Sequence, residues 1–227
     1  MKSFGDYALE LDIWYTPATD YPEEQVGNFR IHHSKYSRGY YQMWGVKDYL
    51  LFRAKKPLPI TLLQEKRGVK WHQWMIDDPP QWYAMQCYAE HSEGAVLTTG
   101  LGLGLIIFEL VKNPSITDIT VVELNQHVID LVSKYLPPDP RIHLVVGDFY
   151  DFIEVDSRQW DSIILDLWVA HGKEQKMDAL YHGVLPLIPI LKFRYPNASI
   201  TFHGFQTVSD IKPISDRMVE LVVGTNR

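Results

Sequence analysis

The feature that most constrains the fold of this chain is a regular alternation of strand-like and helix-like segments after residue 80. Apolar runs with the length of buried strands occur at 95–99, 119–123, 142–146, 160–166 and 198–203. Helical patterns lie at 105–112, 126–135, 149–153, 175–185 and about 209–222. This alternation predicts an α/β fold, with a doubly wound, mainly parallel sheet that carries helices on both faces.

The chain before residue 80 has a different pattern. Short aromatic and β-branched runs are separated by turn formers: YALELDIWY, GYYQMWG, YLLFRA, ITLLQEK and VKWHQWMI. Arg67-Gly68, between the last two runs, predicts a hairpin turn. We therefore expect a small N-terminal β-rich unit at 1–76 and an α/β domain at 77–227.

Aromatic side chains are concentrated in this N-terminal part. Five of the seven tryptophans lie in or just after it: Trp14, Trp44, Trp71, Trp74 and Trp82. An aromatic cage for an amine is one interpretation. Packing of a small β-layer is the favoured one.

Composition excludes several classes of function. With 22 Lys and Arg against 28 Asp and Glu, the net charge is −6, which argues against a nucleic-acid surface because phosphate binding needs clustered basic side chains. Cys87 is the single cysteine and the histidines have no ligand spacing such as H-E-x-x-H, so we expect no disulfide and no metal site. We find neither a signal-peptide core nor a membrane-spanning run, and we expect a cytoplasmic protein.

A glycine-rich loop follows the first strand of the α/β part. In open parallel sheets, ligands bind at the carboxyl ends of the strands. Gly100, Gly102 and Gly104 follow 95–99 directly, and they let the backbone turn sharply and approach a ligand at the next helix N-terminus. The spacing differs from the dinucleotide pattern G-x-G-x-x-G, whose last position is Leu105 here.

Three further strand ends carry acidic residues. Glu123 can accept hydrogen bonds from both hydroxyls of a ribose. The alternative is an exposed acid that caps the following helix. Asp148 can accept from an adenine amino group while Phe149 lies against the ring, and the alternative is another helix N-cap. Asp166, followed by Leu167 and Trp168, places a carboxylate beside the reacting centre.

These residues occur in the order of a known family. The segment VLTTGLGLGLIIFELVKNPSITDITVVELNQHVIDLVSKYLPPDPRIHLVVGDFYDFI resembles the cofactor half of the spermidine synthase-like branch of class I S-adenosylmethionine (AdoMet) methyltransferases. Its Lys-Asn-Pro-Ser-Ile, Val-Glu-Leu, Pro-Arg-Ile and Gly-Asp steps are in family order, the match covers about residues 74–168, and WMIDDPPQWYAM resembles the segment that enters that domain. The resemblance implies a Rossmann-like fold of the class I methyltransferase type, with AdoMet as co-substrate.

The resemblance also assigns roles to the strand-end residues. The three loop glycines would face the methionine moiety, Glu123 the ribose and Asp148 the adenine. Asp166 would orient the acceptor or take its proton, and Trp168 would form a pocket wall near the sulfonium. The predicted cofactor-binding set is Gly100, Gly102, Gly104, Glu123, Leu124, Asp148, Phe149, Asp166 and Trp168, with Asp166 also catalytic.

Two departures from the family pattern bear on the reaction. Aminopropyltransferases have an acid inside the glycine loop, where this chain has Leu103, and a second acid after the fourth strand, where it has Val169. A polyamine is a polycation that needs several carboxylates to replace its water. The GLGLG loop with Asp-Leu-Trp instead resembles a methyltransferase-type subgroup, so we expect a methyltransferase-like enzyme with a small-molecule acceptor.

Two alternatives remain open. A polyamine aminopropyltransferase that uses decarboxylated AdoMet is favoured by the family match and by Asp166. A non-catalytic AdoMet-binding domain is favoured by the short stretch after 220–223, which leaves little room for a closing antiparallel hairpin. A homodimer through the β-rich unit is a further expectation.

Two other motifs have simpler interpretations. Asp77-Asp78-Pro79-Pro80 is similar to the Asp-Pro-Pro-aromatic loop of amino-group methyltransferases, but Gln81 occupies the aromatic position, so a helix N-terminus with proline in its first turn is favoured. His171 and His203 follow the fourth and fifth strands and can approach an acceptor. Surface or satisfied core positions are the favoured interpretation for both histidines.

Overall fold

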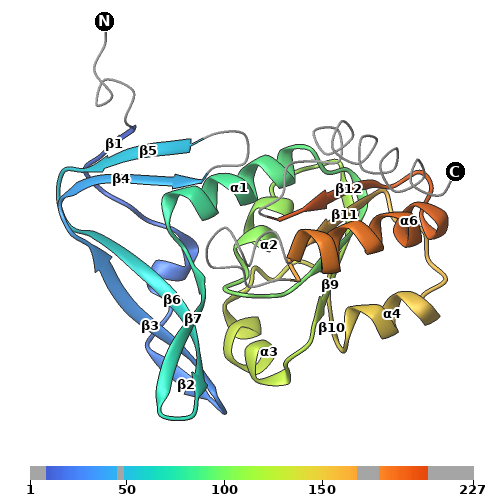
Figure 1. Ribbon diagram of the computed structural model, residues 1–227, viewed down its shortest axis with the longest axis horizontal. Helices are drawn as coiled ribbons and strands as arrows, with labels where there is room; N and C mark the ends of the chain where they lie inside the picture. Colours follow the sequence, from blue (N-terminus) through green and yellow to red (C-terminus); the bar gives the residue numbers. More distant parts are fainter. Residues whose placement is uncertain (1–8, 45–48, 168–178, 204–227) are drawn as a thin grey trace, which may run out of the picture.

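A parallel sheet forms the centre of the α/β part in the computed structural model, which describes residues 9–44, 49–167 and 179–203. Its strands run in the order β10-β9-β8-β11-β12, and every neighbouring pair is parallel (Figure 1). Their bounds are β8 (Gly94–Thr99), β9 (Ile116–Glu123), β10 (Ile142–Val146), β11 (Ser162–Leu165) and β12 (Ser199–Phe202). The chain builds outward from β8 to β10 and then crosses to β11, so the strand order reverses between β8 and β11. The predicted doubly wound, Rossmann-like sheet is confirmed.

Helices cover both faces of this sheet. They are α1 (Pro79–Glu90), α2 (Leu105–Leu110), α3 (Gln126–Val132), α4 (Phe149–Val155) and α6 (Leu185–Arg194). Successive strand residues pack into opposite cores: Val121 joins the cluster beneath α1, α2 and α3, and Val122 joins the cluster beneath α4 and α6. The alternation of side chains along a strand therefore explains why these strands are apolar on both faces.

One helix prediction needs correction. The pattern predicted a helix at about 175–185, of which 175–178 lie outside the described residues. The described part is helical, with a π-helical turn at Leu180–Val184, but the helix continues as α6 from Leu185 to Arg194 and does not end at 185. Pro186 lies in the first turn, where a missing N–H costs little. Pro189 lies inside the helix, and burial of Leu187 and Leu191 against the sheet outweighs its cost. The helix predicted at about 209–222 lies outside the described residues.

The N-terminal part forms two small sheets. One has the order β1-β5-β4, with β1 (Leu9–Leu11), β4 (Gly39–Trp44) and β5 (Tyr49–Ala54). The other is antiparallel in the order β2-β3-β6-β7, with β2 (Glu24–Val26), β3 (Phe29–Tyr36), β6 (Leu58–Arg67) and β7 (Lys70–Ile76). The predicted hairpin at Arg67-Gly68 is confirmed, with Gly68 at φ +62°. β2 and β3 were not predicted.

The two parts of the chain share one core. Phe29 and Ile31 of β3 belong to the same buried cluster as Val128 and Ile129 of α3. Tyr21 stacks on Tyr135 with ring centroids 4.5 Å apart. The division at residue 76 stays a prediction, and the N-terminal sheets pack directly on the α/β part (Figure 1).

The tryptophans pack in separate places. Trp14 lies against the cluster around Phe52, whereas Trp74 meets Phe29 edge-on at 5.7 Å in the larger core. The guanidinium of Arg30 lies 4.2 Å from the Trp71 ring centre. The packing interpretation is confirmed for Trp14 and Trp74.

A pair of buried aspartates joins the two parts. Asp77 accepts hydrogen bonds from the Thr16 hydroxyl and the Thr61 backbone N–H, both at 2.6 Å. Asp78 caps α1 by accepting from the Gln81 N–H, and it also accepts from the Tyr36 hydroxyl at 2.8 Å. The predicted helix N-terminus with proline in the first turn is confirmed, and these two carboxylates hold the N-terminal strands to the start of α1.

Asp78 is expected to make stability depend on pH. Burial raises its pKa to about 6, although the hydrogen bonds from Tyr36 and Gln81 oppose this. Because the folded state keeps the proton where the unfolded chain has lost it, the unfolding free energy falls as the pH rises from about 4 to about 6, by roughly 2–3 kcal/mol. In Asp78→Asn, whose amide oxygen still caps α1, this fall of the unfolding free energy with pH should vanish. Urea denaturation at pH 4.5, 5.5 and 7.5 measures the slope, with Asp118→Asn as control, and equal slopes in wild type and Asp78→Asn would contradict the expectation.

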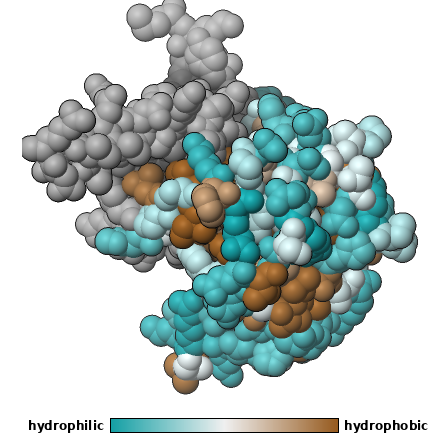
Figure 2. Space-filling model, turned by 90° about the vertical axis from the view of Figure 1, so that its right-hand side faces the viewer, coloured by the Kyte–Doolittle hydropathy of each residue, from teal (hydrophilic) through white to brown (hydrophobic). Residues whose placement is uncertain are grey.

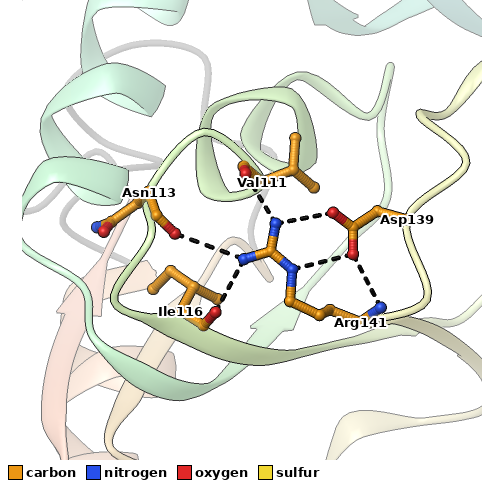
Figure 3. A network of polar contacts seen from close by, with 5 residues as sticks. All are labelled: Val111, Asn113, Ile116, Asp139 and Arg141. Atoms are coloured by element: carbon orange, nitrogen blue, oxygen red, sulfur yellow. Dashed lines mark hydrogen bonds and ion pairs between the residues drawn. The ribbon is translucent and has the colours of Figure 1, made fainter.

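An arginine ties the loop after α2 to the entry of β10. The Arg141 guanidinium donates to the carbonyls of Val111 and Ile116, each at 2.8 Å, and to that of Asn113 at 3.5 Å. Asp139 accepts from its Nε and Nη2, and this contact lowers the pKa of the Asp139 carboxyl to about 2 (Figure 3). The Pro-Arg-Ile step therefore has a structural role in holding the edges of β9 and β10 in place.

The side of the molecule that carries α4 and α6 is largely hydrophilic, with separate hydrophobic patches (Figure 2). Exposed large hydrophobic side chains of these two helices are Tyr150, Val155, Ile190 and Phe193. Among the residues that the structure describes, no helix is long and apolar enough to cross a membrane.

Candidate functional site

The four predicted site segments lie at one edge of the sheet. The glycine loop follows β8, Glu123 ends β9, Asp148 follows β10 and Asp166 follows β11. Because these strands are parallel neighbours, their carboxyl ends lie together, and the reversal of strand order between β8 and β11 places the loop and Asp166 on either side of it. Ligands of open α/β sheets bind at such a reversal.

Glu123 is a buried carboxylate that faces the loop. Its side chain is only 5% exposed, so the alternative of an exposed helix-capping acid is wrong; Asn125 caps α3 instead. One carboxylate oxygen accepts from the Leu101 N–H at 2.7 Å and the other from the Asn125 N–H at 2.8 Å. Burial raises the pKa of Glu123, those two N–H groups oppose the rise, and the nearby charge of Asp166 adds to it. Each oxygen keeps acceptor capacity for a further hydrogen bond.

The loop glycines all have left-handed backbone conformations, but their surroundings differ. The φ angles are +74°, +53° and +74° at Gly100, Gly102 and Gly104. A Cβ atom at Gly102 would lie 2.2 Å from the Met75 sulfur, and one at Gly104 would lie 2.5 Å from Leu136 Cδ2. At Gly100 the single neighbour within 4 Å among the described residues would be the Asp166 carbonyl oxygen, at 3.0 Å. Side-chain packing explains the second and third glycines. At Gly100 the tight contact would be with the backbone of the segment after β11, and among the described residues no side chain lies within 4 Å of that Cβ position.

Alanine substitutions are expected to separate these roles. Gly100→Ala and Gly104→Ala carry the same left-handed backbone cost of about 1–2 kcal/mol. Gly104→Ala adds a collision with Leu136, so it should lower the melting temperature more, and Leu136→Ala should partly restore it. Gly100→Ala places a methyl group against the Asp166 carbonyl oxygen at the ligand edge of the sheet, so it should weaken AdoMet binding more than about 10-fold, or about 1.4 kcal/mol. Thermal denaturation and calorimetry measure the two effects, and equal losses of affinity in the two variants would contradict the assignment.

Asp166 lies half-buried beside the first glycine. Its backbone N–H donates to the Thr99 hydroxyl at 2.8 Å, which fixes the start of the segment after β11. Among the described residues, none donates a hydrogen bond to its carboxylate. This acid therefore has acceptor capacity on the site side of the sheet edge.

The predicted adenine side of the site has a mixed outcome. Asp148 is the N-cap of α4, accepting from the Tyr150 N–H at 2.7 Å, and it is exposed. Phe149 is 3% exposed and packs in the core beneath α4 and α6, so its ring is a core side chain. Leu124 is 69% exposed next to Glu123. Contacts of these three residues with a cofactor stay predictions.

The remaining candidates lie near or beyond the described edge. Trp168, Val169 and His171 fall outside the described residues. His203 follows β12, donates its backbone N–H to the Leu165 carbonyl at 2.7 Å, and meets Tyr88 edge-on. Its Nδ1 atom is buried and has no hydrogen-bond partner among the described residues, so these residues do not supply the contact that a satisfied core position requires. No group of three or more metal-ligating side chains occurs within 9–44, 49–167 and 179–203.

Two residues of the N-terminal part also reach the loop. The Tyr21 hydroxyl donates to the Leu103 carbonyl at 3.1 Å, and the Met75 sulfur accepts from the Leu103 N–H at 3.1 Å. The sequence motifs assigned a role to neither residue: Tyr21 lies outside every motif, and Met75 lies in WMIDDPPQWYAM, which indicated only the segment that enters the α/β domain. Leu103 itself is 0% exposed, so the side chain at this loop position is directed into the core.

Comparison with known proteins agrees with the sequence resemblance. Residues 84–183 match the family described as "Spermine/spermidine synthase domain". The predicted relation to the spermidine synthase-like branch is thereby confirmed for this segment, which includes the glycine loop, Glu123, Asp148 and Asp166.

Individual relatives match over short stretches. A polyamine aminopropyltransferase from Korarchaeum cryptofilum is 34% identical over 89 residues, which are 36% of this chain and 27% of the relative. Putrescine N-methyltransferase 2 from Nicotiana attenuata is 37% identical over 78 residues, 31% of this chain and 21% of the relative. The chain thus spans about a quarter of the length of these relatives. A solved spermidine synthase from Thermotoga maritima aligns with 61% of this chain and 56% of its own, at 16% identity and a TM-score of 0.38.

Proposed function

We propose that this chain is an AdoMet-dependent, methyltransferase-like transferase that acts on a small-molecule acceptor. The observation that carries the proposal is Glu123, a buried carboxylate at the end of β9 with acceptor capacity left, which faces a left-handed glycine loop at the reversal of strand order. Relatives named as aminopropyltransferase and N-methyltransferase both support a transferase. A cytoplasmic location and a homodimer stay predictions.

The residues at the strand ends fit AdoMet. Glu123 would hold the ribose hydroxyls, since each of its oxygens accepts one backbone N–H and can accept one hydroxyl more. Gly100 has no side chain, and no side chain of the described residues comes within 4 Å of where its Cβ would lie, so the methionine part would approach the backbone there. Asp148 would contact the adenine from the end of β10. AdoMet supplies a methyl group on a sulfonium, which a nucleophile attacks in line.

Asp166 would act on the acceptor. Methyl transfer is a direct displacement, so the protein mainly holds the nucleophile in line and excludes water. The Asp166 carboxylate, free of hydrogen bonds from other described residues, would accept a hydrogen bond from the acceptor and take its proton. Thr99 holds the Asp166 backbone, which keeps this carboxylate at the edge between β8 and β11.

The second candidate is a polyamine aminopropyltransferase that uses decarboxylated AdoMet. The relative from Korarchaeum cryptofilum carries that name, and Asp166 is retained. Against it, the loop position that is acidic in aminopropyltransferases is Leu103, which is buried here. A cationic aminopropyl group would lack that carboxylate.

Transfer assays distinguish the candidates. The chain is incubated with methyl-labelled AdoMet and a panel of amines, carboxylates and hydroxyl compounds, and in parallel with decarboxylated AdoMet and putrescine. The proposal expects labelled product and S-adenosylhomocysteine in the first set. A thioether by-product and spermidine in the second set would favour the aminopropyltransferase. No turnover in either set, with binding of AdoMet retained, would favour a non-catalytic AdoMet-binding domain.

Asp166→Asn is expected to keep AdoMet affinity within about 3-fold and to lower turnover at least about 100-fold, the usual scale for loss of a general base. The amide keeps the size of the side chain but takes no proton. Single-turnover methyl transfer with a substrate found in the panel measures the effect, and calorimetry measures the affinity. Unchanged turnover would remove Asp166 from the mechanism.

A further inference from the structure

Leu103 occupies an unusual position in the glycine loop. Both of its backbone polar groups are bonded to side chains of the N-terminal part: its N–H to the Met75 sulfur and its C=O to the Tyr21 hydroxyl, each at 3.1 Å. Neither group is paired within the loop or with helix α2, which begins at Leu105. Buried backbone groups need partners, and here the partners come from residues 82 and 28 positions earlier in the chain.

The two contacts are firmly placed. Met75 is the second-last residue of β7, and its sulfur also fills the space that a Gly102 side chain would need. Tyr21 is buried and stacks on Tyr135, which lies just after α3. Burial raises the pKa of the Tyr21 hydroxyl well above its usual range. The hydroxyl therefore keeps its proton and can donate a hydrogen bond. Contacts other than those with Leu103 therefore also fix the positions of both side chains.

We propose that the N-terminal β-rich unit sets the shape of the glycine loop through Leu103, and that Tyr21 and Met75 are positioning residues for AdoMet. The proposal rests on the proposed function, since it assigns the loop to cofactor binding. The loop is then fixed at two points: Glu123 holds Leu101 from the β9 side, and Tyr21 with Met75 hold Leu103 from the N-terminal side.

The consequence is a coupling between the N-terminal unit and the cofactor. A loop with three left-handed residues has other accessible conformations, and ordering it on binding costs affinity. Contacts that order the loop beforehand remove that cost. Coupling free energies are reciprocal, so bound AdoMet should in turn slow opening of the contacts of Tyr21 and Met75 with Leu103.

Matched variants test the proposal. Tyr21→Phe removes the hydroxyl, and Met75→Leu removes the sulfur acceptor at similar volume. Tyr195→Phe, a buried tyrosine on the opposite face of the sheet, and Met85→Leu, a buried methionine of α1, are the controls. Two quantities are measured for each protein: the exchange rate of the Leu103 amide by NMR without ligand, and the AdoMet affinity by calorimetry.

The expected result is selective. Met75→Leu should raise the Leu103 amide exchange rate about 2- to 10-fold, the effect of losing one hydrogen bond. Each loop variant should weaken AdoMet binding about 2- to 10-fold, the double variant should weaken it further, and the controls should do neither. The melting temperature is followed throughout, because a merely structural contact would lower it without changing the affinity of the folded protein.

Other results overturn the proposal or part of it. If Met75→Leu leaves the exchange rate of the Leu103 amide unchanged, the claim that the N-terminal unit holds the glycine loop is contradicted. Faster exchange with unchanged AdoMet affinity contradicts the positioning role. If wild type itself binds no AdoMet, the proposed function and the positioning role fail together, and the exchange rate then decides by itself whether the N-terminal unit holds the loop.

Discussion

Replacing Glu123 with alanine is expected to weaken AdoMet binding about 10- to 150-fold. A hydrogen bond from a ribose hydroxyl to a buried carboxylate is worth about 1.5–3 kcal/mol, which corresponds to that range. The variant also loses the acceptor of the Leu101 N–H, so the start of the glycine loop is released. Calorimetric titration of wild type and variant with AdoMet measures the effect.

The control for this variant lies on the same strand. Asp118→Ala removes a carboxylate from the opposite end of β9, where it forms an ion pair with His143 at 3.2 Å. It should leave AdoMet affinity within about 2-fold, because it lies at the amino end of the parallel strands, away from the ligand edge. An equal loss of affinity in Asp118→Ala and Glu123→Ala would show that the effect is general destabilisation and would contradict the ribose assignment.

The second large effect is expected on folding. Leu103→Asp introduces the acid that aminopropyltransferases have inside this loop. Leu103 is fully buried in the core that contains α1, α2 and α3, so the substitution loses the packing of the leucine and buries an unpaired carboxylate. The cost should be at least about 4 kcal/mol, a large part of the usual 5–15 kcal/mol stability of a folded protein. Urea denaturation measures it.

Leu103→Met is the matched control, because it keeps an apolar side chain of similar volume. It should cost less than about 1.5 kcal/mol. The opposite outcome would be a stable Leu103→Asp protein that binds decarboxylated AdoMet more tightly than wild type does. It would mean that the side chain at position 103 reaches the ligand. That result would favour the aminopropyltransferase.

Local patterns predicted the α/β sheet well because its strands are apolar on both faces and its helices have recognisable ends. β10 at Ile142–Val146 was predicted with its observed bounds, and β12 within one residue at each end. β3 was missed because Phe29 and Ile31 are its only buried apolar residues and the rest of the strand is polar. Its pairing with β6 across eight residue pairs stabilises it, and long-range pairing of this kind leaves little local signal.

The candidate site was predicted where it follows strand ends and was incomplete elsewhere. Glu123 and Asp166 could be placed from topology alone, since carboxyl ends of parallel strands meet at one edge. Phe149 illustrates the limit: its place after β10 suggested a ligand contact, whereas the ring turns into the core. No motif assigned a role to Tyr21 or Met75, because their contact with Leu103 depends on how the N-terminal sheets pack on the loop.

The most direct test of the central claim is calorimetric titration of the wild-type chain with AdoMet, decarboxylated AdoMet and S-adenosylhomocysteine. A site with Glu123 at the ribose and without an acid at position 103 predicts binding of AdoMet and S-adenosylhomocysteine, and weaker binding of the decarboxylated donor. Preference for the decarboxylated donor would contradict the methyltransferase-like function and favour the aminopropyltransferase. No binding of any of the three would contradict the cofactor site itself.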